Sequence, residues 1–539
     1  MPAVDELLEA WIREETERAP TRATALGLAG GDDRLGDFGA DRWRSERAAD
    51  GRTAAAIEAI EVAGCSPDEQ ADLKLVASEL AGRRVMDDWE GWRRNPAVYL
   101  DPCMQGVFDL WLHRLRPEPE IVEATVRRLG EVPGVLTAAR TNLSEDLMPP
   151  LFARRGVATA RAGARYLAEQ VPSEAADADG RQRLAAAATE AAGALQSFAA
   201  WLDDAESRSL GHWAIGEARY SALLADRELL GADAAKLHER GSAAYDELAG
   251  EMAALAAEID PGAGGWERLL AALDQDCPAT PQEMRDAYER SCHEARQFLV
   301  DHRLVTLPDG ERCVVEPSPV FQRPVLAVAS YSEPPPFSTS RVGHFFVPYP
   351  PDGESPEGVR QRLASNGFHA IPTTAVHEAY PGHHWQLVWS AATPRPVRKV
   401  VTTSYFVEGW ALYAEVMMRR EGFFTDPRAV LSHLGARLFR AARIVVDTAL
   451  HCGEMTVEEA VAYMEQKVAM TPAVARAEVE RYCSWPTQAA SYLTGSLQIE
   501  ALRDRWLGER RGDLRSFHDA VAASPGLPVA LVERLLLGG

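Results

Sequence analysis

The sequence predicts a mainly α-helical protein that contains one small β-sheet. Three observations support this prediction. Over residues 1 to about 300 the chain is rich in Ala, Leu, Glu and Arg, and apolar residues recur three or four positions apart, as at Leu7 and Trp11. Residues 312–350 instead contain short β-branched or apolar runs bounded by prolines, which are typical of strands. From Pro372 onward the helical spacing returns.

Turn residues divide the N-terminal helices from one another. The breaks fall at Gly30–Gly39, Arg94–Pro96, Pro117–Pro119, Val171–Ser173 and Asp260–Gly262. The chain has 539 residues, which is enough for two to four domains or for one large helical body divided by a cleft. Because the pattern changes after the last N-terminal helix, we expect one helical region over residues 1–305 and a second region over residues 306–539.

Short apolar runs at Cys313–Val315, Val325–Val328 and Val342–Val347 are the predicted strands. The last of them lies in a proline-rich loop. Two interpretations of this strand are equally favoured. It is either an edge strand that holds a peptide substrate through backbone pairing, with prolines limiting unwanted pairing, or part of a small sheet that braces the helices.

Helices follow the strands. Thr373 or Thr374 is placed to cap the helix that runs into His377. Further helices are predicted over Glu408–Arg420 and Leu431–Leu450.

Composition excludes several classes of partner. The chain has 57 basic and 80 acidic residues, and its formal net charge of −23 repels phosphate backbones and anionic lipid. Neither nucleic acid nor a membrane surface is therefore an expected partner. The N-terminus lacks the pattern of a signal peptide, and no run of 18 apolar residues occurs, so we expect a cytoplasmic protein. The seven cysteines are scattered, which predicts reduced thiols.

The most informative motif is His-Glu-Ala-Tyr-Pro-Gly-His-His, which begins at His377 and ends at His384. About two dozen residues later, Glu408 lies in an apolar segment. Two imidazoles, a carboxylate ligand and a neighbouring carboxylate, Glu378, make up the residue set of a zinc hydrolase. The motif therefore predicts a Zn²⁺ site.

The spacing leaves the second histidine ligand open. On a straight helix His384 faces almost the same way as His377, but roughly 10 Å along the axis, while His383 points about 120° away. Pro381 removes a backbone hydrogen bond and crowds the carbonyl four residues before it. We therefore expect a kink or bulge, eased by Gly382, which would bring His383 towards His377.

The two motifs resemble a large bacterial family known only as a domain of unknown function, which is related to the gluzincin zinc metallopeptidases. The segment around Glu408 is also similar to the one that carries the glutamate ligand in thimet-type oligopeptidases. The resemblance implies His377, His383 and Glu408 as zinc ligands and Glu378 as the catalytic base. It also implies a large, two-lobed helical fold, in which the N-terminal region walls a deep cleft and the small sheet lies next to the zinc helix.

Glu408 has a specific reason to be a metal ligand, because a carboxylate among apolar residues needs a cationic partner. Three other polar residues have weaker support for a role at the site. Glu415, two turns further on, either orients a histidine ligand or forms an ordinary salt bridge. Asp447 and His451 share a helix face; they either support the site or contact the substrate, or they form a satisfied buried pair, which explains them equally well.

The segment from Arg481 to Gly495 resembles a C-terminal motif of the same family. Its Tyr492 is the candidate for stabilising an oxyanion, and a tyrosine in the hydrophobic core is an equally good interpretation.

These observations lead to one functional hypothesis and two alternatives. The hypothesis is a zinc-dependent metallopeptidase, an oligopeptidase or a carboxypeptidase, which hydrolyses short peptides or peptide-like amides with a zinc-activated water. One alternative is a non-haem iron oxygenase, which would use two histidines and a carboxylate but leave Glu378 without a role. The other is a helical binding protein without activity, in which the metal only stabilises the fold.

Overall fold

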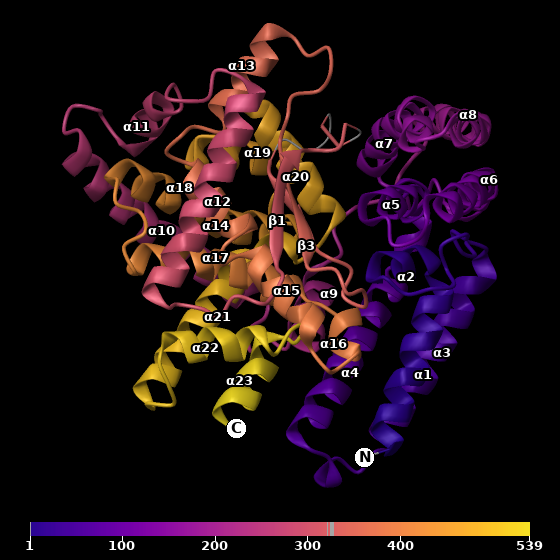
Figure 1. Ribbon diagram of the computed structural model, residues 1–539, viewed down its shortest axis with the longest axis horizontal. Helices are drawn as coiled ribbons and strands as arrows, with labels where there is room; N and C mark the ends of the chain where they lie inside the picture. The colour runs from indigo at the N-terminus through magenta and orange to yellow at the C-terminus, as the bar shows by residue number, and fades with distance from the viewer. Residues whose placement is uncertain (1, 321, 324–327, 539) are drawn as a thin grey trace. The chain divides into compact units, whose positions relative to one another are not determined.

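The computed structural model describes residues 2–320, 322–323 and 328–538. The chain forms two compact units (Figure 1). Unit 1 comprises Met1–Trp213 and Pro335–Thr339, and unit 2 comprises Ala214–Pro334 and Ser340–Gly539. The boundary expected near residue 305 therefore falls inside unit 2. Sequence periodicity could not place it, because the helices between residues 214 and 305 have the same pattern as those before them, but pack against the C-terminal helices.

The regular elements of unit 1 are all helices in the part of the chain that the structure describes. Its helices are α1 (Pro2–Arg18), α2 (Pro20–Leu26), α3 (Ala40–Glu58), α4 (Pro67–Asp88), α5 (Ala97–His113), α6 (Glu118–Asn142), α7 (Pro150–Glu169) and α8 (Ala178–Glu206), with short turns η1 (Val62–Gly64), η2 (Gly91–Arg93) and η3 (Val171–Glu174). The alanine-rich α8 packs against α6 and α7. It does so through Leu184, Leu195, Phe198 and Leu202, all fully buried, which recur on one face of the helix.

Unit 2 contains the remaining helices and all three strands of the described chain. Its elements are α9 (Glu217–Ala222), η4 (Leu223–Arg227), α10 (Ala234–Ile259), α11 (Trp266–Leu273), α12 (Pro281–His302), β1 (Arg312–Pro317), β2 (Ser330–Ser332), β3 (Val342–Val347), α13 (Pro356–Ala364), α14 (Ile371–Glu378), α15 (His383–Ala392), α16 (Val397–Val400), α17 (Ser404–Arg420), α18 (Pro427–Cys452), α19 (Val457–Val468), α20 (Pro472–Ser484), α21 (Gln488–Gly508), α22 (Leu514–Ala522) and α23 (Val529–Leu537). The prediction of a mainly helical chain with a small sheet is confirmed.

The three strands form one sheet in the order β1-β3-β2. Strand β3 pairs with β1 in parallel and with β2 in antiparallel orientation. The strand predicted over Val342–Val347 is therefore the central strand, and its interpretation as a free edge for a substrate is wrong. Strand β2 has only three residues and was not predicted, because so short a run carries no periodicity. Most of the strand predicted over Val325–Val328 lies outside the described residues.

Helix α17 lies at the centre of unit 2 and packs against α14, α15 and α21. It begins at Ser404, four positions before the predicted start, because Thr403 caps it by accepting a hydrogen bond from the backbone amide of Tyr405 at 3.2 Å. Its close contact with α21 depends on two glycines. A Cβ atom on Gly495 would lie 1.9 Å from the carbonyl oxygen of Tyr405 and 2.9 Å from the Cα atom of Gly409. The backbones of the two helices therefore touch where a side chain would not fit.

This contact makes a testable prediction about stability. Gly495→Ala should lower the free energy of unfolding, because the added methyl must push two backbones apart, and overpacking of this kind costs about 1–3 kcal/mol. Gly250→Ala on α10 is the matched control. No atom lies within 4 Å of a Cβ at that position, so the better helix propensity of Ala should stabilise the protein by about 0.5–1 kcal/mol. Chemical denaturation measures both; equal effects of the two changes would contradict the packing argument.

Two further features concern the cysteines and the apolar character of the helices. All seven cysteines are free thiols, and four of them, Cys65, Cys103, Cys292 and Cys483, are buried. Among the residues that the structure describes, none of the helices combines the length and apolar character that a membrane span requires.

Candidate metal centre

The motif that begins at His377 spans a break between two helices. Helix α14 ends at Glu378, and α15 begins at His383. The sequence predicted one kinked helix; the structure instead has a turn at Ala379–Gly382. The prediction underestimated the break, because a proline can neither donate a helical hydrogen bond nor fit beside the preceding turn. The predicted cap is also wrong, since α14 starts after Ala370 without a side-chain cap.

Gly382 allows this turn to fold tightly. Its amide donates a hydrogen bond to the carbonyl of Val376 at 3.0 Å. A Cβ atom on Gly382 would lie 1.8 Å from the carbonyl oxygen of His377, so no other residue fits without moving the backbone. The indole nitrogen of Trp410 on α17 donates to the carbonyl of Pro381 at 2.8 Å and ties the turn to the helix that carries Glu408.

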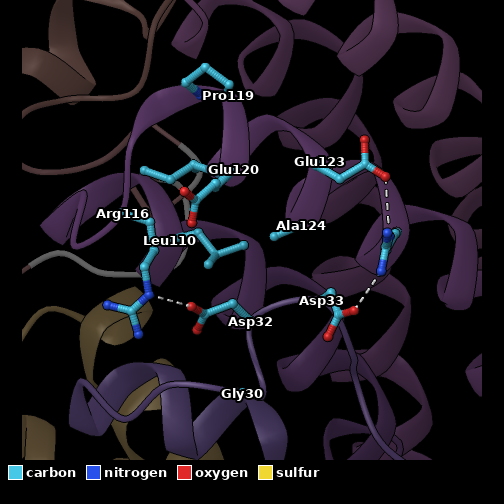
Figure 2. Close-up of a pocket in the computed structure, with 11 residues that line it drawn as sticks. Gly30, Asp32, Asp33, Leu110, Arg116, Pro119, Glu120, Glu123 and Ala124 are labelled. Carbon is cyan, nitrogen blue, oxygen red and sulfur yellow. Dashed lines mark hydrogen bonds and ion pairs between the residues drawn. The ribbon is translucent and has the colours of Figure 1, made fainter.

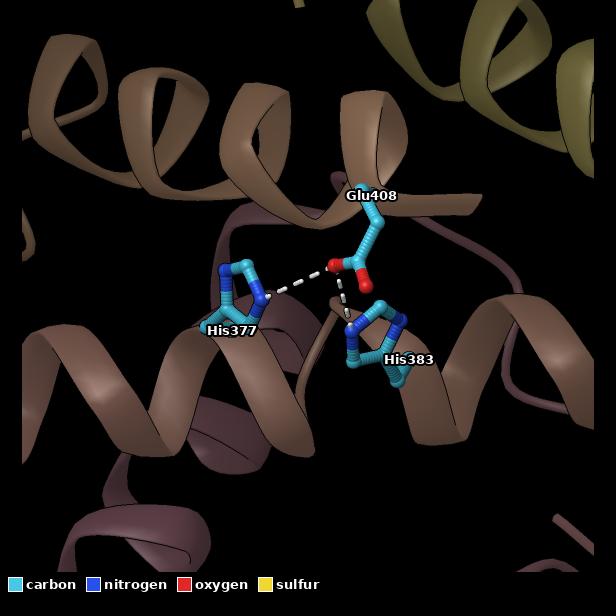
Figure 3. A group of neighbouring side chains, drawn as sticks. All are labelled: His377, His383 and Glu408. Atoms are coloured by element: carbon cyan, nitrogen blue, oxygen red, sulfur yellow. Dashed lines mark ion pairs between the residues drawn. The ribbon is translucent and has the colours of Figure 1, made fainter. Parts of the chain in front are cut away.

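The turn brings His383 to His377 and Glu408 (Figure 3). The Oε2 atom of Glu408 lies 3.6 Å from Nε2 of His377 and 3.3 Å from Nε2 of His383. Potential ligand atoms of the three residues all lie within 4.8 Å of one another. Both histidines are buried, and the Glu408 side chain is 19% exposed. The structure therefore gathers all three residues that the sequence singled out as metal ligands.

The spacing fits a tetrahedral ion. Bonds of about 2.0–2.2 Å to a tetrahedral centre place neighbouring ligand atoms roughly 3.4 Å apart, close to the two distances above. The charges also suit a cation. Burial raises the pKa of Glu408, but the two imidazoles outweigh burial and hold that pKa well below its usual range. Glu408 is therefore an anion that both histidine rings face.

Glu415 supports His377 from the side opposite Glu408. The Nδ1 atom of His377 lies 2.8 Å from Oε1 of Glu415, which is fully buried. Burial works against the charged imidazole, yet Glu408 and Glu415 raise the pKa of His377 to about 9. The second oxygen of Glu415 lies 3.3 Å from Nδ1 of His433 on α18. Such a carboxylate fixes the tautomer that leaves Nε2 free to bind a metal.

We expect Glu415→Gln to weaken metal binding without removing a ligand. The amide is nearly the same size as the carboxylate but orients the His377 ring less strongly, and losses of this kind are about 10- to 100-fold in affinity. Competition with a fluorescent chelator measures the dissociation constant. An unchanged constant would show that Glu415 is a buried ion-pair partner and does not tune the site.

Glu378 is the last residue of α14 and is buried next to the cluster. Within the described chain, its carboxylate has no hydrogen bond or ion pair. Burial raises its pKa, and the charges of His377, His383 and Glu408 all act on it. A buried carboxylate without a partner is costly, so its presence here favours a role in proton transfer.

Tyr492 reaches the cluster from α21. Its ring stacks on that of His377 with centroids 6.5 Å apart, and its hydroxyl accepts a hydrogen bond from the Gln488 side chain at 3.1 Å. Burial, followed by the negative charge of Glu408, raises the pKa of Tyr492. The phenol is therefore protonated at neutral pH and can donate a hydrogen bond.

His384 points away from the cluster and is fully buried. Its Nδ1 atom lies 2.9 Å from the hydroxyl of Tyr331 on β2, and its Nε2 atom lies 2.9 Å from the carboxylate of Glu311. Arg296 and Tyr380 also donate to Glu311. This network anchors the start of α15 next to the sheet, and the sequence offered no signal for Glu311 or Tyr331.

Asp447 and His451 form a buried structural pair. Asp447 accepts hydrogen bonds from the hydroxyl of Tyr220 at 2.5 Å and from the backbone amide of Thr487 at 3.1 Å, and burial raises its pKa to about 7. His451 contacts the carbonyl of Tyr482 at 3.0 Å. Of the two interpretations left open, the structure favours the buried pair, which holds the turn before α21.

A surface pocket of about 450 Å³ is lined by residues of unit 1 (Figure 2). Both arginines that line it are held in ion pairs. Arg116 pairs with Asp32 at 3.1 Å, and Arg127 pairs with Asp33 at 2.8 Å. No group in this pocket matches the chemistry that the sequence predicts.

The fold and the cluster together define a mainly helical protein with a candidate His-His-Glu metal site. The chain belongs to the bacterial proteins of unknown function called DUF885, whose family model matches residues 20–536. No curated protein matches the sequence.

Solved structures share the fold. A candidate lipoprotein of unknown function from Shewanella oneidensis matches with a TM-score of 0.80 and 21% identity, over 99% of both chains. A candidate lipoprotein from Colwellia psychrerythraea matches with a TM-score of 0.82 and 17% identity, over 99% of this chain and 98% of the other.

Proposed function

We propose that this protein is a zinc-dependent metallohydrolase that cleaves short peptides or peptide-like amides. The observation that carries the proposal is Glu378. A metal that only stapled the fold would need His377, His383 and Glu408, but not a buried carboxylate without a partner beside them. An iron oxygenase would leave Glu378 equally unexplained.

The donor set suits zinc. Two imidazole nitrogens and one carboxylate oxygen are typical of catalytic zinc sites, which keep one position open. When bound, Zn²⁺ would polarise the scissile carbonyl and lower the pKa of a water molecule to about 7. Glu415 and Glu408 would keep the imidazole of His377 oriented with Nε2 towards the ion.

Residues of the chain would transfer the proton and stabilise the oxyanion. Glu378 would accept a proton from the attacking water and later deliver it to the leaving amine, as a general base and then a general acid. The Tyr492 phenol, held by Gln488 and the His377 ring, would donate a hydrogen bond to the oxyanion that forms from the carbonyl.

The relation to the gluzincin peptidases, including a cleft that excludes folded proteins, is part of this proposal. The relation to the gluzincins, as distinct from the cleft, is supported by the order of the site residues along the chain: His377 and Glu378 at the end of one helix, His383 at the start of the next, and Glu408 on a later helix. The cytoplasmic location stays a prediction, and two structural neighbours are described as candidate lipoproteins.

A peptide library tests the proposal. The protein loaded with Zn²⁺ should produce new peptide fragments, detected by mass spectrometry, and removal of the metal with a chelator should abolish them. The same digestion without oxygen should proceed unchanged, because hydrolysis needs no oxidant. Metal-dependent thermal stabilisation without any cleavage would instead support the metal-stapled binding protein, and oxygen consumption with Fe²⁺ would support the oxygenase.

A further inference from the structure

Three arginines, Arg440, Arg443 and Arg481, lie near Tyr492. The guanidinium carbon of Arg443 lies 4.7 Å from the centre of the Tyr492 ring, and that of Arg440 lies 5.9 Å from it. Arg481 donates to the side-chain oxygen of Gln488 at 2.7 Å, and Gln488 in turn donates to the Tyr492 hydroxyl. Positive charge is therefore concentrated beside the proposed oxyanion donor, in a protein whose net charge is −23.

Only two of these arginines have a carboxylate partner in the described chain. Arg443 and Arg481 share Glu478, at 2.7 Å and 3.1 Å. Among the residues that the structure describes, Arg440 has no carboxylate within 4.0 Å; it donates from Nη1 to the carbonyl of Ala436 at 3.2 Å. Its Nε atom is buried without a hydrogen-bond partner.

Arg440 also lies near the proposed base. Burial dominates the pKa of Glu378, and Arg440 is among the charges that lower it. The same guanidinium acts on the buried Glu415. Arg440 is half-buried, has unused hydrogen-bond donors, and contacts the Tyr492 ring that also stacks on His377. Such a guanidinium can bind an anionic group of a bound molecule.

We propose that Arg440 binds a carboxylate of the substrate and so selects which peptides are cleaved. This inference rests on the proposed function. Arginine and carboxylate form paired, charge-assisted hydrogen bonds with a fixed geometry, which gives specificity as well as affinity. The carboxylate is either the C-terminus of the peptide, which would make the protein a carboxypeptidase, or an acidic side chain. Both sources present the same group to Arg440.

Three peptides separate the sources. They are acetylated tetra-alanine with a free C-terminus, its C-terminal amide, and the amide with aspartate as the third residue. For the zinc-loaded protein we expect kcat/KM to be about 10- to 100-fold higher for at least one carboxylate peptide than for the neutral amide. Preference for the free C-terminus identifies a carboxypeptidase, and preference for the aspartate peptide identifies side-chain recognition. Equal rates for all three would overturn the proposal.

Arg440→Gln should abolish this preference. Its kcat/KM for the preferred peptide should fall to the value that the same variant shows for the neutral amide, mainly through a higher KM, and its zinc content should be unchanged. Arg437→Gln is the matched control on the same helix; it removes an arginine paired with Glu500, which keeps Arg420 as a partner. Equal loss on all peptides in Arg440→Gln would mean that Arg440 only balances the negative charge of the site, and would overturn the proposal.

Binding gives a readout that does not require turnover. Calorimetry with tetra-alanine analogues whose amide carbonyls are reduced should show tighter binding of the free acid, or of the aspartate form, than of the neutral amide. Arg440→Gln should lose that difference. Carboxylate-dependent binding without any hydrolysis would support Arg440 while contradicting the proposed function, whereas the absence of carboxylate dependence would overturn the role of Arg440 alone.

Discussion

Glu378→Gln will leave zinc binding intact and remove nearly all hydrolysis. The amide cannot accept a proton from water, while His377, His383 and Glu408 are untouched. A general base contributes about 10²- to 10⁴-fold, so kcat should fall by that amount with little change in KM. Because Glu378 has no hydrogen bond to lose in the described chain and its pKa is raised by burial, the variant should be at least as stable as the wild type.

The measurement is steady-state kinetics on a peptide found in the library screen, together with zinc content by elemental analysis. Glu421→Gln, at the end of α17 and outside the site, is the control and should behave as wild type. Wild-type turnover in Glu378→Gln on any substrate would remove Glu378 from the chemistry.

Glu408→Ala will lose the metal. The change removes one of three protein ligands, so bound zinc should fall from roughly one ion per chain to near zero after dialysis. The fold should survive, because the buried Glu415 still pairs with His377 when Glu408 is removed. Circular dichroism checks the fold, and elemental analysis checks the metal. Full zinc occupancy at unchanged affinity would show that Glu408 is not a ligand.

The sequence predicted the elements that have strong periodicity or sharp boundaries. Strand β3 occupies the residues predicted for it, and the helix expected over Leu431–Leu450 lies within α18. Local pattern could not reveal that β3 is central, since the order of strands in a sheet depends on pairing between segments far apart in the sequence.

The candidate site was predictable where its residues lie close in sequence. His377, Glu378 and His383 share one motif, and the apolar surroundings of Glu408 indicated a need for a cation. His433 and Arg440 could not be found in this way. Both lie on α18, whose helical pattern says which face is buried but not which distant side chains that face will meet.

The sequence predicted a kink at Pro381, whereas the structure has a complete break between α14 and α15, and the reason is again contacts between segments distant in sequence. Pro381 indicated distortion, but the degree of distortion depends on contacts that local sequence does not show. Trp410 holds the turn from α17, and the close approach of Gly382 to the carbonyl of His377 completes it.

Zinc titration of two single variants tests the central claim most directly, because the turn at Pro381 decides which histidine meets His377. His383→Ala should bind no zinc. His384→Gln should bind one ion per chain with nearly wild-type affinity, because His384 contacts Tyr331 and Glu311 instead, and an amide can still donate to Glu311. Calorimetric titration of both purified variants into the same zinc buffer gives the answer. Retention of zinc by His383→Ala together with its loss from His384→Gln would contradict the site described here.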